Sequence, residues 1–248
     1  MNTSTESSPS GRRTDRGLAD QVYAALDTVR DPELDESIVS LKFVSSVAVS
    51  AEDRSGNAVA EVHLRLPTYF CAPNFAFLMV ADAYDATMAV PGVSGASVVL
   101  DDHFASSAIN GGVAAQAGFQ GTFEGEAENE LDELRANFLR KAVLAGQDRV
   151  ARPLLSQGWT PQRLADATLG QLPDSPDVRR LRHRRRLLGL PAGDQDALLV
   201  EADGTPVSLA GLPLHLRRAR TTRVGMEANG EYCRGLLADR YNLAEGRR

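Results

Sequence analysis

The 248-residue chain lacks the features that mark several common classes of protein. Its two cysteines, Cys71 and Cys233, are too few for a disulfide framework. They also cannot supply the four thiolates of a self-contained zinc or iron–sulfur site. No run of about 18 apolar residues is present, so no membrane-spanning helix is expected. The first 17 residues have no apolar core, so no secretory signal is expected there. These absences predict a cytoplasmic protein with reduced thiols.

Motifs of the common enzyme classes are also missing. The sequence has no phosphate-binding glycine loop, dinucleotide fingerprint, metalloprotease motif or serine nucleophile elbow. The charge is uneven, since residues 1–105 carry a net charge of −8 and residues 106–248 carry +2. Neither part is basic enough to indicate nucleic-acid binding, and the asymmetry favours two units with different roles. We therefore predict a protein that is not an enzyme.

Residues 17–104 have the pattern of a small α+β domain. Apolar residues at helical or alternating spacing predict a helix, a two-stranded hairpin, a second helix and a last strand. Their expected ranges are 17–30, 43–50 with 59–66, 75–90 and 96–101. This order predicts an α-β-β-α-β sandwich with its helices on one face of a short sheet.

The other segments have different compositions. Residues 1–16 are polar and without periodicity, which predicts a disordered tail. Residues 105–127 are rich in Gly, Ala and Ser, which predicts a linker or extended arm. Residues 128–248 show helical stripes and Ser/Thr-Pro capping signals, so we expect a mostly α-helical region. A short hairpin is expected there around Asp203-Gly204, and a final helix over 229–241.

Cys71 is the residue best placed for chemistry. It lies after a predicted strand and just before a predicted helix, where backbone N–H groups and the helix dipole favour a thiolate. A thiolate can ligate iron or zinc, or attack an electrophile. An enzyme that uses Cys71 as its nucleophile would need a nearby base, and no histidine is adjacent in the sequence. The simpler alternative is a buried cysteine that acts as a small hydrophobic residue.

An ordered set of motifs surrounds this cysteine. It comprises an apolar helix, the Asp31-Pro32-Glu33 turn, a Ser37-Ile38-Val39 segment, and Thr68 followed by Cys71 before the second apolar helix. With these features, residues 18–103 resemble the iron–sulfur cluster assembly domain family, which includes SufT, PaaD and the eukaryotic cytosolic iron–sulfur targeting factors. Many members have proline directly after the cysteine, whereas this chain has Ala72 between Cys71 and Pro73.

The resemblance implies a maturation factor that helps to build or deliver an iron–sulfur cluster or another iron centre to a client metalloprotein. One thiolate cannot hold a cluster, so Cys71 would share a transient cargo with a second subunit of a homodimer, a carrier or the client. Four residues are expected to support the loop: Asp31, Glu33, Thr68 and Asn74. For Asp31 and Glu33 the alternative is a plain helix-ending turn.

The strongest basic run lies at residues 178–188. We interpret Arg182, Arg185 and Arg186 as a binding surface for an acidic partner, with phosphate binding as the alternative. Cys233 is expected on the inner face of the final helix, and a second metal thiolate is the other interpretation. His63 and His103 fit a polar strand face and an acidic strand end, respectively, or metal ligation.

The layout of an assembly domain with an arginine-rich helical extension also resembles accessory proteins of soluble di-iron monooxygenases. This resemblance implies an oxygenase component as the client. A different hypothesis is a protein-interaction adaptor or chaperone that keeps the fold without metal chemistry. It predicts that Cys71 tolerates replacement by serine, whereas a maturation factor does not.

Overall fold

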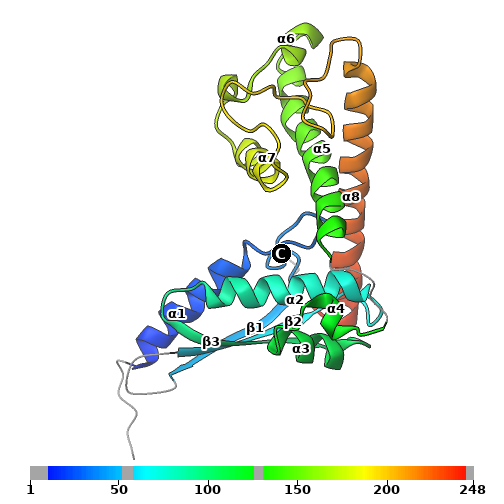
Figure 1. Ribbon diagram of the computed structural model, residues 1–248. Helices are drawn as coiled ribbons and strands as arrows, with labels where there is room; N and C mark the ends of the chain where they lie inside the picture. The colour runs from blue at the N-terminus through cyan, green and yellow to red at the C-terminus, as the bar shows by residue number, and fades with distance from the viewer. Residues whose placement is uncertain (1–10, 52–57, 126–130, 244–248) are drawn as a thin grey trace, which may run out of the picture. The chain divides into compact units, whose positions relative to one another are not determined.

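A computed structural model of the chain describes residues 11–51, 58–125 and 131–243. The chain forms two units, and each is described by itself (Figure 1). The first unit contains the residues up to 131 together with those from 230 onward, and the second contains residues 132–229. The predicted division at residues 104 and 127 is therefore different from the observed one, because the end of the chain belongs to the first unit. Of the disordered tail predicted at residues 1–16, residues 1–10 lie outside the described residues. Residues 11–16 are helical, so the prediction is wrong for that part.

The first unit contains a three-stranded sheet in the order β1-β2-β3. Strand β1 (Val44–Ala51) pairs antiparallel with β2 (Ala58–Arg65), and β2 pairs parallel with β3 (Val93–Asp101). Val62 at the centre of β2 lies opposite Val47 on one side and Val98 on the other. The predicted hairpin and last strand are confirmed.

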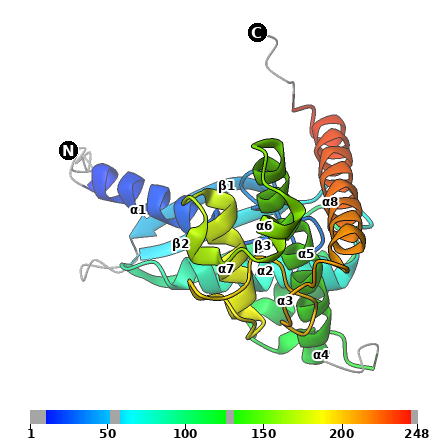
Figure 2. The same ribbon diagram turned by 90° about the horizontal axis from the view of Figure 1, so that it is seen from above.

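Helices α1 (Gly11–Leu26) and α2 (Pro73–Met88) cover one face of this sheet (Figures 1 and 2). On β2 the side chains at alternate positions are buried toward these helices, whereas Glu61 and His63 on the other face are exposed or half-buried. The burial of alternate positions is the direct result of the two-residue period of a strand. The predicted α+β class is confirmed. Helix α1 begins at Gly11, earlier than expected.

The segment predicted as a linker is folded onto the first unit. It forms α3 (Ser106–Ala114) and α4 (Gly118–Thr122). The amide group of Asn110 caps the edge of β3, since its Oδ1 accepts the Leu100 N–H at 2.8 Å and its Nδ2 donates to the Leu100 carbonyl at 3.2 Å. A Cβ atom at Gly112 would lie 1.9 Å from Thr122 Oγ1, so glycine allows α3 and α4 to approach closely. The small residues therefore serve packing, and the linker prediction is wrong.

The last part of helix α8 (Leu212–Arg240) completes the first unit. Leu237 is 1% exposed and belongs to the same apolar core as the sheet and α2. The Arg240 guanidinium donates to the Leu66 carbonyl oxygen at 3.1 Å. The final helix expected over 229–241 exists, but it starts much earlier in the sequence.

The second unit is mostly helical, as expected. It contains α5 (Asp132–Ser156), α6 (Pro161–Ala165), the short 3-10 helix η1 (Leu169–Gln171), α7 (Pro176–Leu187) and the first part of α8. Thr160 and Ser175 cap α6 and α7 through their hydroxyl oxygens, as the Thr-Pro and Ser-Pro pairs predicted. The expected hairpin is reduced to one antiparallel bridge between Val200 and Pro206. Among the described helices, none combines the length and apolar content needed to cross a bilayer.

Candidate functional site

Cys71 lies in the loop between β2 and α2. Strand β2 ends at Arg65 and α2 begins at Pro73, so the cysteine stands two residues before the helix. Cys71 is half-buried at the margin of the apolar core rather than enclosed in it. Its Sγ lies 3.4 Å from Thr68 Oγ1, which also accepts the Phe70 N–H at 3.3 Å. Thr68 therefore ties the thiol to the turn that carries it.

His103 fixes the same loop from the end of β3. Its side chain is 3% exposed. The Ala105 N–H donates to Nδ1 at 3.2 Å, so Nδ1 carries no proton and the Nε2 N–H donates to the Cys71 carbonyl oxygen at 2.7 Å. Both ring nitrogens are occupied, so His103 positions the cysteine backbone and is not a metal ligand in this arrangement. No local sequence pattern indicates this role, because it depends on the sheet bringing β3 beside the loop.

Asp31 organises a turn at the same side of the unit. Its Oδ1 accepts the N–H groups of Glu33 and Leu34, each at 2.9 Å. Burial raises the pKa of the Asp31 carboxyl to about 6, and the neighbouring carboxylates of Glu33 and Glu36 add to the increase. Asp31 thus has the turn-forming role that its place before proline suggests. Because the side chain is buried, its ionised form costs free energy in the folded protein.

Two further residues predicted to support the loop have smaller roles. Asn74 lies in the first turn of α2, and its Oδ1 accepts the Phe75 N–H at 2.9 Å. It satisfies one of the free N–H groups at the start of the helix. Glu33 is exposed, and its backbone N–H rather than its carboxylate enters the Asp31 turn.

Cys233 reaches this region from the end of the chain. It is half-buried on α8, and burial is the largest cause that raises the pKa of its thiol to about 11. The next causes are the charges of Asp31, Cys71 and Glu33, so these three groups lie within electrostatic range of the Cys233 sulfur. Both cysteines are partly buried against the same apolar core. Within the described residues, no three His, Cys, Asp or Glu side chains form a ready-made metal site.

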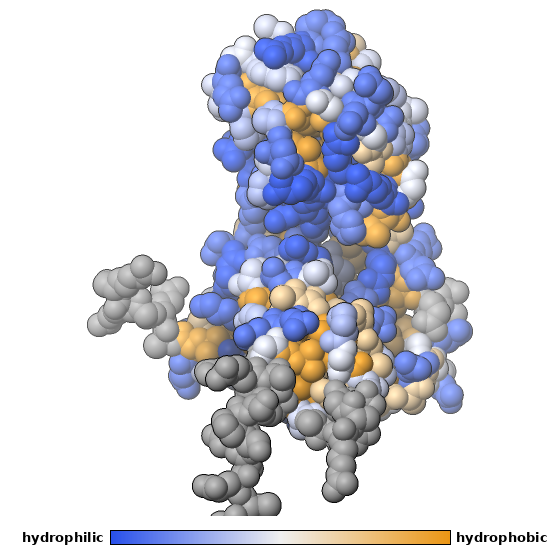
Figure 3. All heavy atoms as spheres, turned by 90° about the vertical axis from the view of Figure 1, so that its left-hand side faces the viewer, coloured by the Kyte–Doolittle hydropathy of each residue, from blue (hydrophilic) through white to orange (hydrophobic). Residues whose placement is uncertain are grey.

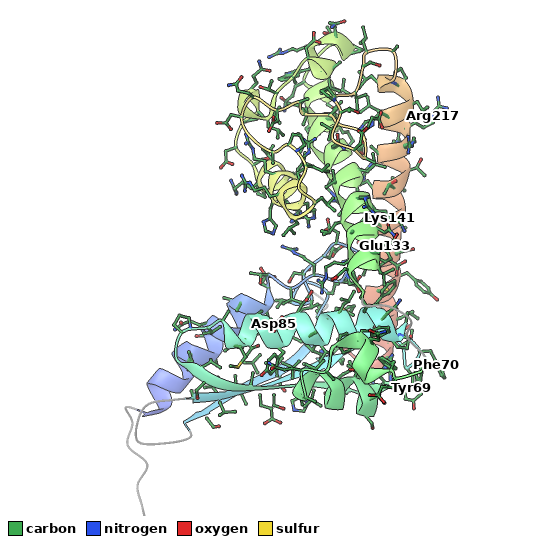
Figure 4. The ribbon with its side chains drawn as sticks, viewed as in Figure 1. Tyr69, Phe70, Asp85, Glu133, Lys141 and Arg217 are labelled. Atoms are coloured by element: carbon green, nitrogen blue, oxygen red, sulfur yellow. The ribbon has the colours of Figure 1, made fainter. Side chains whose placement is uncertain are left out.

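Three exposed aromatic side chains flank the Cys71 loop. Tyr69, Phe70 and Phe104 are 45%, 76% and 49% exposed. The Tyr69 and Phe70 rings pack edge to face at 5.0 Å, and Phe104 lies 6.0 Å from Phe70. Figure 4 shows Tyr69 and Phe70 projecting outward from the loop. We call Tyr69, Phe70 and Phe104 the aromatic patch. Exposed aromatic clusters of this kind are typical of contact surfaces.

The arginines of α7 do not form the single partner-binding surface that we predicted. Arg185 is fully buried, and its guanidinium donates to the carbonyl oxygens of Ala197 and Leu198 and to Gln147 Oε1. Burial lowers the Arg185 pKa to about 10. Arg182 is turned inward to the Ala192 carbonyl oxygen and to Asp194. The prediction is wrong for Arg185, which is buried and holds the second unit together. For half-buried Arg182 and exposed Arg186, binding of a partner stays a prediction.

The surface seen in Figure 3 is largely hydrophilic over the second unit.

His63 lies away from the cysteines, on the open face of the sheet. Its Nδ1 lies 3.0 Å from Asp101 Oδ1 and its Nε2 lies 3.1 Å from Glu61 Oε1. Hydrogen bonds to Asp101 and then Glu61 raise the pKa of His63. The contact between His63 and Asp101 links β2 to β3, and it accounts for a histidine at this position without a bound metal.

Comparison with known proteins gives a family match for part of the chain. Residues 19–98 match the family model described as iron–sulfur cluster assembly protein. The matched span contains the sheet up to Val98 in β3, helix α2 and the Cys71 loop. The match confirms the resemblance predicted from the sequence motifs, and it supports a role in iron–sulfur cluster assembly. Cys233 and the second unit lie outside it.

The other comparisons add less. No curated protein matches the chain. Among solved structures, the chain is similar to one described as a domain of unknown function, DUF59, from Bacillus anthracis. The two are 25% identical with a TM-score of 0.31, over 39% of this chain and 87% of that one.

Proposed function

We propose that this protein is a maturation factor that helps to build or deliver an iron–sulfur cluster, or another iron centre, to a client protein. The observation that carries the proposal is the family match over residues 19–98, which includes Cys71. The position of Cys71 agrees with it. The thiol stands at the margin of the core, in a loop held by Thr68 and by His103.

The cargo is held weakly in this proposal. Thiolates are the usual ligands of iron–sulfur clusters, and a cluster needs four ligands. Cys71 supplies one of them, and the others come from the cargo's donor, the client or a second copy of the chain. Incomplete ligation suits a protein whose cargo must leave. The chain itself performs no catalytic step in this account.

The client binds at the aromatic patch. Tyr69 and Phe70 are exposed and separated from Cys71 by at most one residue, so they lie on the surface that a protein sharing a metal ion with Cys71 would approach. Tyrosine and phenylalanine are among the residues enriched in protein interfaces. The layout of the chain suggests a component of a soluble di-iron monooxygenase as the client. Co-purification of such a component with the full chain tests this assignment.

Anaerobic reconstitution tests the metal chemistry. The full chain is incubated with ferrous iron, sulfide and dithiothreitol, desalted, and analysed for iron, sulfide and visible absorption. We expect the unmodified protein to retain iron and sulfide, and the Cys71→Ser variant to lose most of both. Ala72→Ser is the matched control, because it adds the same hydroxyl at an exposed neighbouring position and leaves the thiol in place.

Two results would change the conclusion. Equal iron and sulfide in the Cys71→Ser and unmodified proteins would exclude Cys71 as a ligand. If, in addition, Cys71→Ser still bound and activated the client, the protein would be an adaptor that keeps the assembly fold without metal chemistry.

A further inference from the structure

Strand β1 lies at one edge of the sheet. The strand order is β1-β2-β3, so β1 has β2 on one side, and no further described strand pairs with its other side. An edge strand presents a row of backbone N–H and C=O groups that have no partner within the sheet. Such a row can pair with a strand of another molecule.

The two edges of the sheet differ in how they are protected. On β3, the amide of Asn110 exchanges two hydrogen bonds with the backbone of Leu100, as a neighbouring strand would. Charged residues, prolines and bulges are the usual means of protecting an exposed edge. Residues 45–51 of β1 contain no charged residue and no proline, and the irregularity in register lies at the start of the strand, between Val44 and Ser46. From Ser46 onward, β1 is therefore a regular and uncharged edge.

Two valines on this edge are incompletely buried. Val47 lies opposite Val62 and Val49 lies opposite Ala60, and both partners in β2 are 0% exposed. Val47 and Val49 pack against the same apolar core but remain half-buried, because they stand on the outermost strand. A further strand beside β1 would cover the apolar surface that these valines leave exposed, which is favourable.

The sequence of β1 reads the same in both directions about Ala48. Residues 46–50 are Ser-Val-Ala-Val-Ser. When two such strands pair antiparallel around a two-fold axis at Ala48, Ser46 of one copy lies opposite Ser50 of the other, and Val47 lies opposite Val49. Valine then meets valine on the side of the core, and serine or alanine meets its like on the open face. Pairs of β-branched side chains across neighbouring strands stabilise a sheet, and a two-fold contact needs such a self-complementary surface.

We propose that β1 is a self-association surface, at which two copies of the chain join their sheets edge to edge through antiparallel pairing of residues 46–50. The occupant of the edge is a second copy because the edge is uncharged and matches itself position by position. The inference goes beyond the proposed function and requires no metal.

The pairing has a consequence for the Cys71 loop. Val44 at the start of β1 lies opposite Leu64 near the end of β2, so β1 begins at the end of the sheet where the Cys71 loop follows. Antiparallel pairing sets this end of one copy beside the other end of the second copy. The two Cys71 loops therefore lie at opposite ends of the joined sheet. A second copy bound at this edge supplies no ligand to the same cluster, and each loop meets its own client.

Sedimentation velocity of the full chain at increasing protein concentration tests the pairing. We expect the unmodified chain to form dimers, and Ala48→Lys to weaken the association by about tenfold or more, because like charges directly opposite each other destabilise paired strands. Ala48 is exposed and lies opposite Glu61 of β2, so the new lysine has an acidic neighbour within its own copy. The thermal unfolding of Ala48→Lys should therefore match that of the unmodified chain at concentrations where both are monomers.

Ser97→Lys is the matched control. Ser97 is exposed and lies opposite the same Glu61, but on β3, away from the β1 edge. This variant adds the same charge to the same face of the sheet and should form dimers as the unmodified chain does.

A mixture of two variants tests the register. Ala48→Glu alone should associate as weakly as Ala48→Lys, since two carboxylates then face each other. An equal mixture of Ala48→Lys and Ala48→Glu should form dimers again, because opposite charges meet across the interface. This rescue requires that position 48 of one copy lies opposite position 48 of the other.

Three results would overturn the inference. The first is an unmodified chain that stays monomeric at every concentration, and the second is a dimer that Ala48→Lys leaves intact. The third is a monomeric chain whose client binding is lost in Ala48→Lys, which would assign the edge to a strand of the client. The Cys71→Ser variant should form dimers as the unmodified chain does, so failure of the metal chemistry and failure of the pairing are separate outcomes.

Discussion

Asp31 is a carboxylic acid whose ionised form the fold penalises. The side chain is 7% exposed, and its carboxyl pKa rises from 3.8 to about 6, chiefly through burial. An acid with a raised pKa binds a proton more readily in the folded state than in the unfolded state. Asp31 therefore favours unfolding as the pH rises from about 4 to about 6, and the cost is constant above that range.

The variant Asp31→Asn tests this cost in the metal-free protein. Asparagine keeps the Oδ1 acceptor for the N–H groups of Glu33 and Leu34 but carries no charge. At pH 7.5 we expect its free energy of unfolding to exceed that of the unmodified chain by about 1–3 kcal/mol, since one unit of pKa shift corresponds to about 1.4 kcal/mol. Near pH 4 the gain should be small. Urea unfolding at both pH values measures it.

Asp31→Ala is the control for the turn, because it removes the charge and the acceptor together. It should be less stable than Asp31→Asn at every pH. A gain for Asp31→Asn that is the same at pH 4 and pH 7.5 would show that the carboxyl is not penalised by burial.

At this scale the sequence identified the residues of a motif but not their tertiary partners. The prediction of Thr68 beside Cys71 came from a short local pattern, and the two side chains do touch. His103 comes 32 positions later and meets the loop only because β2 and β3 pair in parallel. The basic run at residues 178–188 predicts an exposed Arg185, but here backbone carbonyl oxygens of Ala197 and Leu198 satisfy its buried guanidinium.

The loop between β2 and α2 is the element that combines the thiol and the aromatic patch. Its backbone is tied down by Thr68 and by His103, so the exposure of Phe70 is a property of an ordered loop. Phe70 at 76% exposure contributes little to the core. An apolar side chain held in water costs free energy that a partner surface can recover.

Phe70→Ala should therefore leave stability unchanged within about 0.5 kcal/mol and weaken binding to the client by at least tenfold. Co-purification of the client with the full chain, followed by a binding titration, measures the effect. Tyr23→Ala is the matched control, because Tyr23 is another exposed aromatic residue, 44% accessible, on α1. Equal losses for both variants would show that the effect is not specific to the aromatic patch.

The helices and strands with a regular apolar period were predicted well. The elements that were missed lack such a period. Helices α3 and α4 are built from Gly, Ala and Ser, whose role in close packing becomes visible only when Gly112 meets Thr122. Helix α8 passes from the second unit into the first and has no single apolar face along its length, so only its last part was predicted.

At the scale of the whole chain, the assembly-like domain is completed by residues far outside the family match. The matched span ends at residue 98, while the core also contains Ile109, Val113 and Leu237. The sequence pattern predicts the domain but not its completion by the C-terminal helix. The reason is that this helix adds only a few core residues, such as Leu237, and these lie far from the domain in the sequence. The same helix places Cys233 against the apolar core of this domain, far outside the matched span.

The central claim is that Cys71 carries an iron–sulfur or iron cargo in the cell. The most direct measurement is the iron and sulfide content of the full chain isolated anaerobically from cells, without reconstitution, for the unmodified protein and its Cys71→Ser and Ala72→Ser variants. We predict that the unmodified protein and Ala72→Ser retain iron, whereas Cys71→Ser retains almost none. Equal iron in all three proteins, or iron in none of them when the client is co-expressed, would contradict the account.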